Sequence, residues 1–121
     1  TEIYTLSLHD ALPIWGRDRT RGKKIPLEKL ISMQTLETSR LLGISDRGVL
    51  KEGYKADINV IDFDNLTLHE PEVIHDLPAG GRRLIQKASG YEYTIVSGQI
   101  AFKNGEATGA LNGRLIRNQI S

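Results

Sequence analysis

The clearest hydrophobic pattern in the chain lies between residues 27 and 42, where mostly apolar residues recur at three- and four-residue spacing. This spacing predicts one face of a helix, made of Leu27, Leu30, Ile31, Gln34, Thr38, Leu41 and Leu42. Pro26 suits a first helical turn because its missing N–H would be unpaired there. Gly43 can take the left-handed conformation that ends a helix. Thr35, Thr38 and Ser39 weaken the middle, which makes a break near Gln34 into two shorter helices plausible.

After Gly53 the pattern changes to short runs typical of strands. The run from Ala56 to Ile61 places Ile58 and Val60 on one face, with Asp57, Asn59 and Ile61 on the other. Further strands are expected at Arg83–Ala88, Tyr93–Val96 and Gln99–Phe102.

The turn residues indicate how these strands connect. Ser97-Gly98 fits a tight hairpin, and Asn104-Gly105 supplies the next turn. Residues 65–81 contain two prolines and a glycine pair, and we expect them to be irregular. Three or four strands of this kind make an open, partial sheet with an unprotected edge. The order of a helix followed by strands predicts an α+β organisation.

Composition is ordinary for a globular chain of 121 residues, with 39% apolar residues and 16 basic against 15 acidic ones. The basic cluster Arg17, Arg19, Arg21, Lys23 and Lys24 predicts a solvated loop. We expect no nucleic-acid partner, because stacking aromatics are not interleaved with these charges.

Other function classes are excluded by what the sequence lacks. Without cysteine there is no disulfide framework and no thiolate ligand or nucleophile. No run approaches the roughly 18 to 20 apolar residues that span a bilayer, so no membrane partner is expected. We expect the true N-terminus to be absent, so no signal peptide can be read from this sequence. A cytoplasmic location is therefore only the default expectation.

The first fourteen residues, Thr1 to Ile14, resemble what a common short-read sequencing adapter encodes when translated in one frame. We therefore predict that they are an artefact, to be set aside from fold reasoning as tags and fusion scars are. The chain would then be a fragment of a misassembled environmental (metagenome) gene, with genuine sequence from about Trp15.

Three blocks carry a family resemblance: residues 46–62, 75–84 and 108–114. Together they resemble the C-terminal end of an N-acyl-D-amino-acid deacylase (D-aminoacylase) of the amidohydrolase superfamily, over roughly Trp15 to Arg117. The element Gly53 to Asp57 is shared with dihydroorotases and hydantoinases, so it identifies only the superfamily. Residues 76–81 and 108–114 are more specific to the D-aminoacylase branch, although Asn112 stands where that branch often has proline.

The resemblance implies a division of the chain. Residues 15–45 would be the end of the catalytic TIM-type barrel, as its terminal helix or helix pair, and residues 46–121 the C-terminal strands of a small β-sandwich. The missing barrel and the N-terminal sandwich strands would be the partners of these segments.

The resemblance also implies the chemistry of the parent enzyme. It would be a zinc-dependent hydrolase that converts a small-molecule substrate, an N-acyl-D-amino acid, to a D-amino acid and a carboxylate. Such enzymes hold metal with a His-x-His pair, later histidines and an Asp after the last barrel strand. None of these motifs occurs here, so we assign no catalytic residue and no metal ligand, substrate-binding residues remain unknown, and we expect the isolated fragment to be inactive.

Alternatives remain open at this point. We interpret His69-Glu70 and His75-Asp76 as polar loop residues; the alternative is that they form a metal site. A further alternative for residues 76–81 is a shaped loop near the barrel mouth or at a domain contact of the intact enzyme. Gly80 to Arg83 only weakly suggests phosphate binding. The whole chain could instead be a stand-alone interaction module or a piece of a cyclic amidohydrolase.

Overall fold

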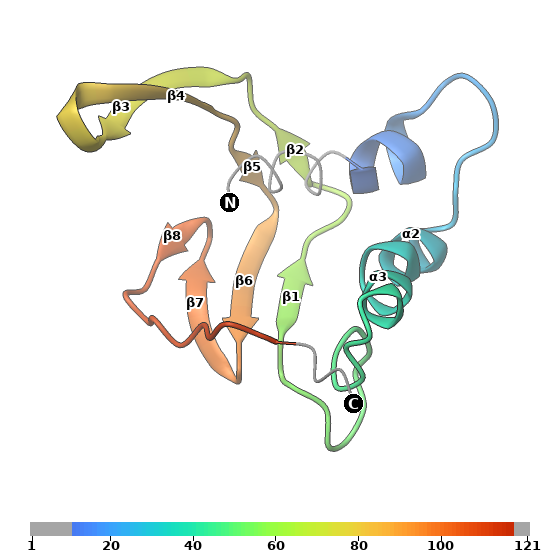
Figure 1. The fold of residues 1–121 in the computed structure, drawn as a ribbon. Coiled ribbons are helices and arrows are strands. Elements are labelled where there is room, and N and C mark those ends of the chain that lie inside the picture. The colour runs from blue at the N-terminus through green and yellow to red at the C-terminus, as the bar shows by residue number, and fades with distance from the viewer. Residues whose placement is uncertain (1–10, 118–121) are drawn as a thin grey trace.

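The computed structural model describes residues 11–117, which form a helical part and a set of antiparallel strands (Figure 1). Residues 11–13 are helical and lead into the π-helical segment η1 (Ile14–Asp18). Two helices follow, α2 (Leu27–Gln34) and α3 (Leu36–Leu41). No helix among residues 11–117 is long and apolar enough to cross a membrane.

The predicted break in the helix is confirmed at Thr35, whose φ of −118° and ψ of −79° leave the helical geometry. The hydroxyl of Thr35 donates to the Ile31 carbonyl at 2.7 Å, and that of Thr38 donates to the Gln34 carbonyl at 2.9 Å. Such bonds to the preceding turn compete with the helical ladder and favour bending. Gly43 has a φ of 71°, as expected of the residue that ends a helix.

Four strands form the main sheet in the order β1-β6-β7-β8, with every pair antiparallel. They are β1 (Ile58–Ile61), β6 (Tyr91–Val96), β7 (Gln99–Lys103) and β8 (Glu106–Ala107). Both predicted tight turns are confirmed. Ser97-Gly98 and Asn104-Gly105 have positive φ at both central residues, the geometry that matches the twist of paired strands.

The strands between β1 and β6 differ from the prediction. Residues 65–81 are not irregular throughout, because they contain β2 (Thr67–Leu68) and β3 (Glu72–Leu77). The expected strand Arg83–Ala88 is divided between β4 (Gly81–Ile85) and β5 (Ala88–Ser89), which pair with β3 and β2 respectively. The turn η2 (Pro78–Gly80) joins β3 to β4 in an arm that extends away from the main sheet (Figure 1).

The start of β1 also differs from the prediction. The strand begins at Ile58 rather than Ala56, and the pairing shifts between Val60, opposite Tyr93, and Ile61, opposite Tyr91. This bulge leaves one residue of β6 without a partner. Val60 is 38% exposed, while Ile61, expected on the opposite face together with Asp57 and Asn59, packs against the core.

A small core joins the helical part to the strands. Its centre is Leu66, which is fully buried, with Leu12 and Leu30 at 3% and 5% exposure. Partly buried apolar side chains surround it: Ile25, Leu27, Ile61, Phe63 and Tyr91.

The end of the segment set aside on sequence grounds therefore takes part in packing through Leu12. Residues 1–10 of that segment lie outside the described residues. Burial of one leucine does not test the origin of the segment, so its assignment to an adapter stays a prediction. The α+β organisation is confirmed.

Candidate functional site

The histidine–acid pairs form no metal centre among the residues that the structure describes. His69 follows β2, and its Nε2 lies 2.6 Å from the Ser89 hydroxyl. Its backbone N–H donates to the Lys87 carbonyl at 2.9 Å. Over residues 11–117, no group of three or more His, Asp or Glu side chains is arranged to hold a metal ion. The described residues therefore do not fit the zinc centre that the resemblance implies, and no hydrolytic step is derived from them.

The Asp76 side chain has a partner across the arm. Arg83 Nε donates to one Asp76 carboxylate oxygen at 2.7 Å, and Arg83 Nη2 donates to the other. This bidentate pair links β3 to β4 just before the turn, where Ala79 and Gly80 have φ of 59° and 70°. Because Arg83 is engaged with a carboxylate, the contact does not support the phosphate-binding interpretation of Gly80 to Arg83.

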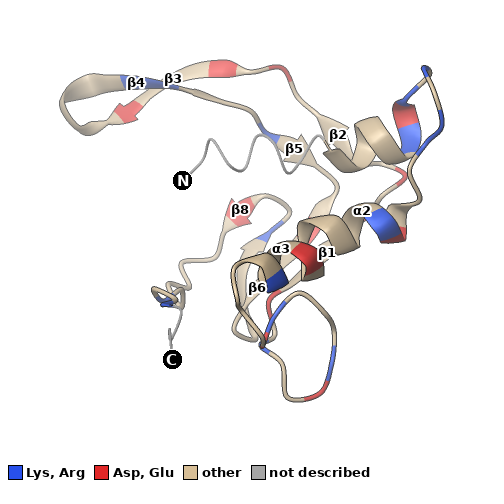
Figure 2. Ribbon diagram, turned by 45° about the vertical axis from the view of Figure 1, so that its right-hand side comes forward, with Lys and Arg blue, Asp and Glu red and all other residues tan. Residues whose placement is uncertain are grey.

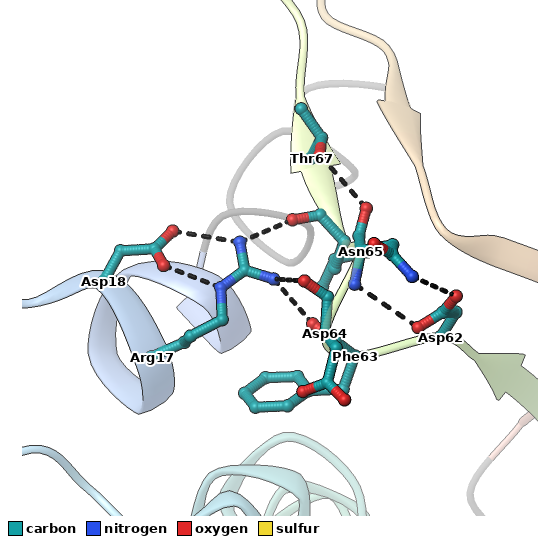
Figure 3. A network of polar contacts seen from close by, with 8 residues as sticks. Arg17, Asp18, Asp62, Phe63, Asp64, Asn65 and Thr67 are labelled. Atoms are coloured by element: carbon teal, nitrogen blue, oxygen red, sulfur yellow. Dashed lines mark hydrogen bonds and ion pairs between the residues drawn. The ribbon is translucent and has the colours of Figure 1, made fainter.

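The most extensive polar network centres on Arg17 of η1 (Figure 3). Its guanidinium donates to the backbone carbonyls of Phe63, Asp64 and Leu66 at 2.6, 2.8 and 2.7 Å. It also lies over the Phe63 ring, 5.8 Å from the centroid, within the range of cation–π attraction. The expectation that Arg17 belongs to a solvated loop is therefore wrong, because this side chain fixes the turn between β1 and β2.

Asp18 completes the network by accepting from Arg17 Nε at 2.6 Å and from Nη2 at 3.1 Å. The hydrogen bond from Arg17 lowers the pKa of the Asp18 carboxyl, desolvation opposes it, and attraction to Arg17 and Lys24 adds to it. The same bond, which is the largest effect on Arg17, raises the pKa of that guanidinium. The pair therefore stays charged across the neutral range.

The turn that Arg17 contacts is also stabilised by hydrogen bonds between its own residues. The Asp62 carboxylate accepts from the side chain of Asn65 at 2.8 Å and from its backbone N–H at 3.3 Å. The side-chain bond and then the backbone bond of Asn65 lower the pKa of Asp62. Gly90 lies against this turn, where a Cβ would come within 2.8 Å of Leu66 Cα.

The element Gly53 to Asp57, on which the superfamily resemblance partly rests, has a structural role in this chain. Gly53 has a φ of 84°. The Asp57 carboxylate accepts from the Ser97 backbone N–H at 2.8 Å, and its other oxygen lies 2.9 Å from Arg47 Nε, an ion pair without hydrogen-bond geometry. Asp57 thus holds the β6–β7 turn against the start of β1.

Comparison with known proteins places these observations in a family. The model of the amidohydrolase family matches residues 3–102. The chain belongs to the amidohydrolase family. The match begins inside the first fourteen residues, so it does not separate that segment from the rest.

Individual relatives are enzymes of more than one kind. A dihydroorotase of Elusimicrobium minutum is 28% identical over 101 residues, covering 83% of this chain and 23% of that protein. A 5-methylthioadenosine/S-adenosylhomocysteine deaminase of Halothermothrix orenii is 33% identical over 84 residues, covering 68% of this chain and 18% of that protein. The chain thus spans about a fifth of the length of these relatives. No solved structure gives a significant match.

Sequence reasoning missed the Arg17 network for a physical reason. Arg17 lies 46 to 49 positions from the carbonyls that it contacts, and nothing in its neighbourhood distinguishes it from Arg19 or Arg21. The one available signal was Asp62-Phe63-Asp64-Asn65, whose polar residues favour a turn with carbonyls to satisfy.

Proposed function

We propose that the chain is the C-terminal portion of a metal-dependent amidohydrolase that hydrolyses N-acyl-D-amino acids. In that reaction water adds to the acyl carbonyl, the C–N bond breaks, and the leaving nitrogen takes a proton. The products are a carboxylate and a free D-amino acid. In this proposal residues 15–45 end the catalytic barrel and residues 46–121 are sandwich strands.

The observation that carries the proposal is the pair of segments typical of the D-aminoacylase branch, residues 76–81 and 108–114, within a chain of this family. In the structure both have defined roles. Asp76 and the turn after it shape the arm. The Thr108 hydroxyl donates to the Ile100 carbonyl at 2.6 Å, and the Asn112 amide donates to the Val96 carbonyl. These contacts support a scaffolding role for this portion of the enzyme.

The test is the activity of the complete protein that contains this segment. It would be loaded with zinc and offered N-acetyl-D-amino acids, their L-isomers and cyclic imides or dihydroorotate. Release of free amino acid from the D-isomers alone supports the proposal. The same protein with its His-x-His histidines changed to alanine is the control for metal-independent background, and the 121-residue chain alone should release nothing.

A cyclic amidohydrolase is the second candidate, favoured by the similarity to a dihydroorotase. Ring opening of a cyclic substrate, with no release of D-amino acid, would replace the first proposal by this one. Failure on both substrate classes by a folded, zinc-loaded protein would contradict both candidates.

A further inference from the structure

A cleft of about 530 Å³ is lined by residues of the C-terminal tail, the start of β1 with the loop before it, and the β6–β7 turn. This volume is within the range of about 300–1,000 Å³ found for small-molecule sites. Its polar lining comes from three separate segments and includes Arg47, Lys55, Asp57, Ser97, Asn112 and Arg114. None of these residues carries a role in the hydrolysis proposed above.

The walls of the cleft are held by hydrogen bonds. The Asn112 amide donates to the Val96 carbonyl and ties the tail to β6. On the opposite wall, the Gly98 N–H donates to the Ala56 carbonyl at 2.9 Å and the Ser97 N–H donates to Asp57 at 2.8 Å. A cleft braced on both sides loses little conformational freedom when a ligand enters.

The described lining residues of the cleft carry a positive net charge. Asp57 is the one carboxylate among them, and both of its oxygens are engaged, one with Arg47 and the other with Ser97. Among the residues that the structure describes, neither Lys55 nor Arg114 makes an ion pair, and both are exposed. Figure 2 shows basic residues both in the loop that follows α3 and on the C-terminal tail. Two lining cations from opposite walls are thus without an acidic partner among the described residues.

We propose that this cleft binds the oxyanion group of a small ligand, a carboxylate or a phosphate, between Lys55 and Arg114. The planar guanidinium of arginine offers paired N–H donors that match two oxygens of either group, and the lysine ammonium adds a compact charge. Arg47 stays paired with Asp57, so these two charges offset each other and the net positive charge of the described lining comes from Lys55 and Arg114. This site does not depend on the proposed hydrolytic activity.

The test is an NMR titration of the isotopically labelled 121-residue chain with inorganic phosphate and, separately, with acetate, at constant ionic strength set by chloride. We expect saturable shifts confined to the amides of Ser97, Gly98 and Gly113. The double change Lys55→Gln with Arg114→Gln should weaken binding about tenfold or more, because each cation supplies a charge-assisted contact. Lys103→Gln removes an exposed cation of β7 outside the cleft and should leave the affinity unchanged.

Each outcome decides the proposal. Tighter binding of phosphate than acetate identifies a phosphate ligand, and the reverse order identifies a carboxylate. Shifts that do not saturate, or an equal loss in the Lys103→Gln chain, would show nonspecific attraction and overturn the site. A titration spectrum without dispersed amide signals would also overturn it, because the folded cleft would then be absent.

Discussion

Truncation of Leu66 tests whether one core joins the helical part to the strands. Leu66 is fully buried and packs with Leu12, from the helical residues before η1, and with Leu30 of α2. Leu66→Ala removes three buried carbon atoms, at about 0.8 kcal/mol each for the loss of burial. The cavity left behind adds to this, which brings the expected loss to about 3 kcal/mol. For a small domain this is a large part of the free energy of unfolding.

The assay is urea unfolding followed by far-UV circular dichroism, with the free energy taken from the midpoint and the m-value. Leu111→Ala is the matched control, because the same atoms are removed from a side chain that is 97% exposed. Leu66→Met keeps the volume and should cost less than about 1.5 kcal/mol. A Leu66→Ala chain that unfolds within about 0.5 kcal/mol of the Leu111→Ala control would refute the shared core.

Three further predictions follow from individual contacts. Gly48→Ala should destabilise the chain by roughly 2 kcal/mol more than Gly53→Ala. Both glycines have positive φ, but of the two only Gly48 would bring a Cβ to 2.8 Å from another backbone atom. Equal losses in the free energy of urea unfolding would contradict this reason. The stability contributed by Asp18 should be present above the ordinary carboxyl pKa of about 4 and lost as the pH falls through its lowered pKa. The free energy of unfolding between pH 7 and pH 2 should therefore depend less on pH in the Arg17→Met chain. An unchanged pH dependence would show that the Arg17–Asp18 pair does not stabilise the fold. Leu12→Ala should cost about 2 to 5 kcal/mol if the segment before Trp15 contributes to the core, whereas a neutral result would show that its packing is dispensable.

The local features of the fold were predictable because their causes are local. Thr35 breaks the helix through a hydroxyl contact with the preceding turn. Ser97-Gly98 and Asn104-Gly105 form tight turns because these residues accept positive φ at low cost. Such signals act within a few positions and can be read directly from the sequence.

The arm formed by β3 and β4 was not predictable in the same way. Pro71 and Pro78 suggested irregular chain, yet they lie just outside β3, where a missing N–H costs no ladder bond. The pairing of Asp76 with Arg83 depends on the register of the arm. The bulge in β6 opposite Val60 and Ile61 likewise depends on the pairing of distant segments.

The resemblance to amidohydrolases was found from short segments whose residues prove to be structural. Asp57 joins β1 to the β6–β7 turn, and Asp76 braces the arm. These contacts explain how a chain can carry the marks of an enzyme family without a metal centre among its described residues. Motifs with a structural role can identify the superfamily, whereas substrate preference depends on residues of the active site.

A long-read sequence of the locus upstream of Trp15, free of adapter, tests most directly whether this chain is the C-terminal portion of an amidohydrolase. We expect a continuous reading frame that carries a His-x-His pair, later barrel histidines and an Asp shortly before Trp15. A start codon close to Trp15, with no barrel sequence ahead of it, would contradict the proposed amidohydrolase portion and leave an interaction module.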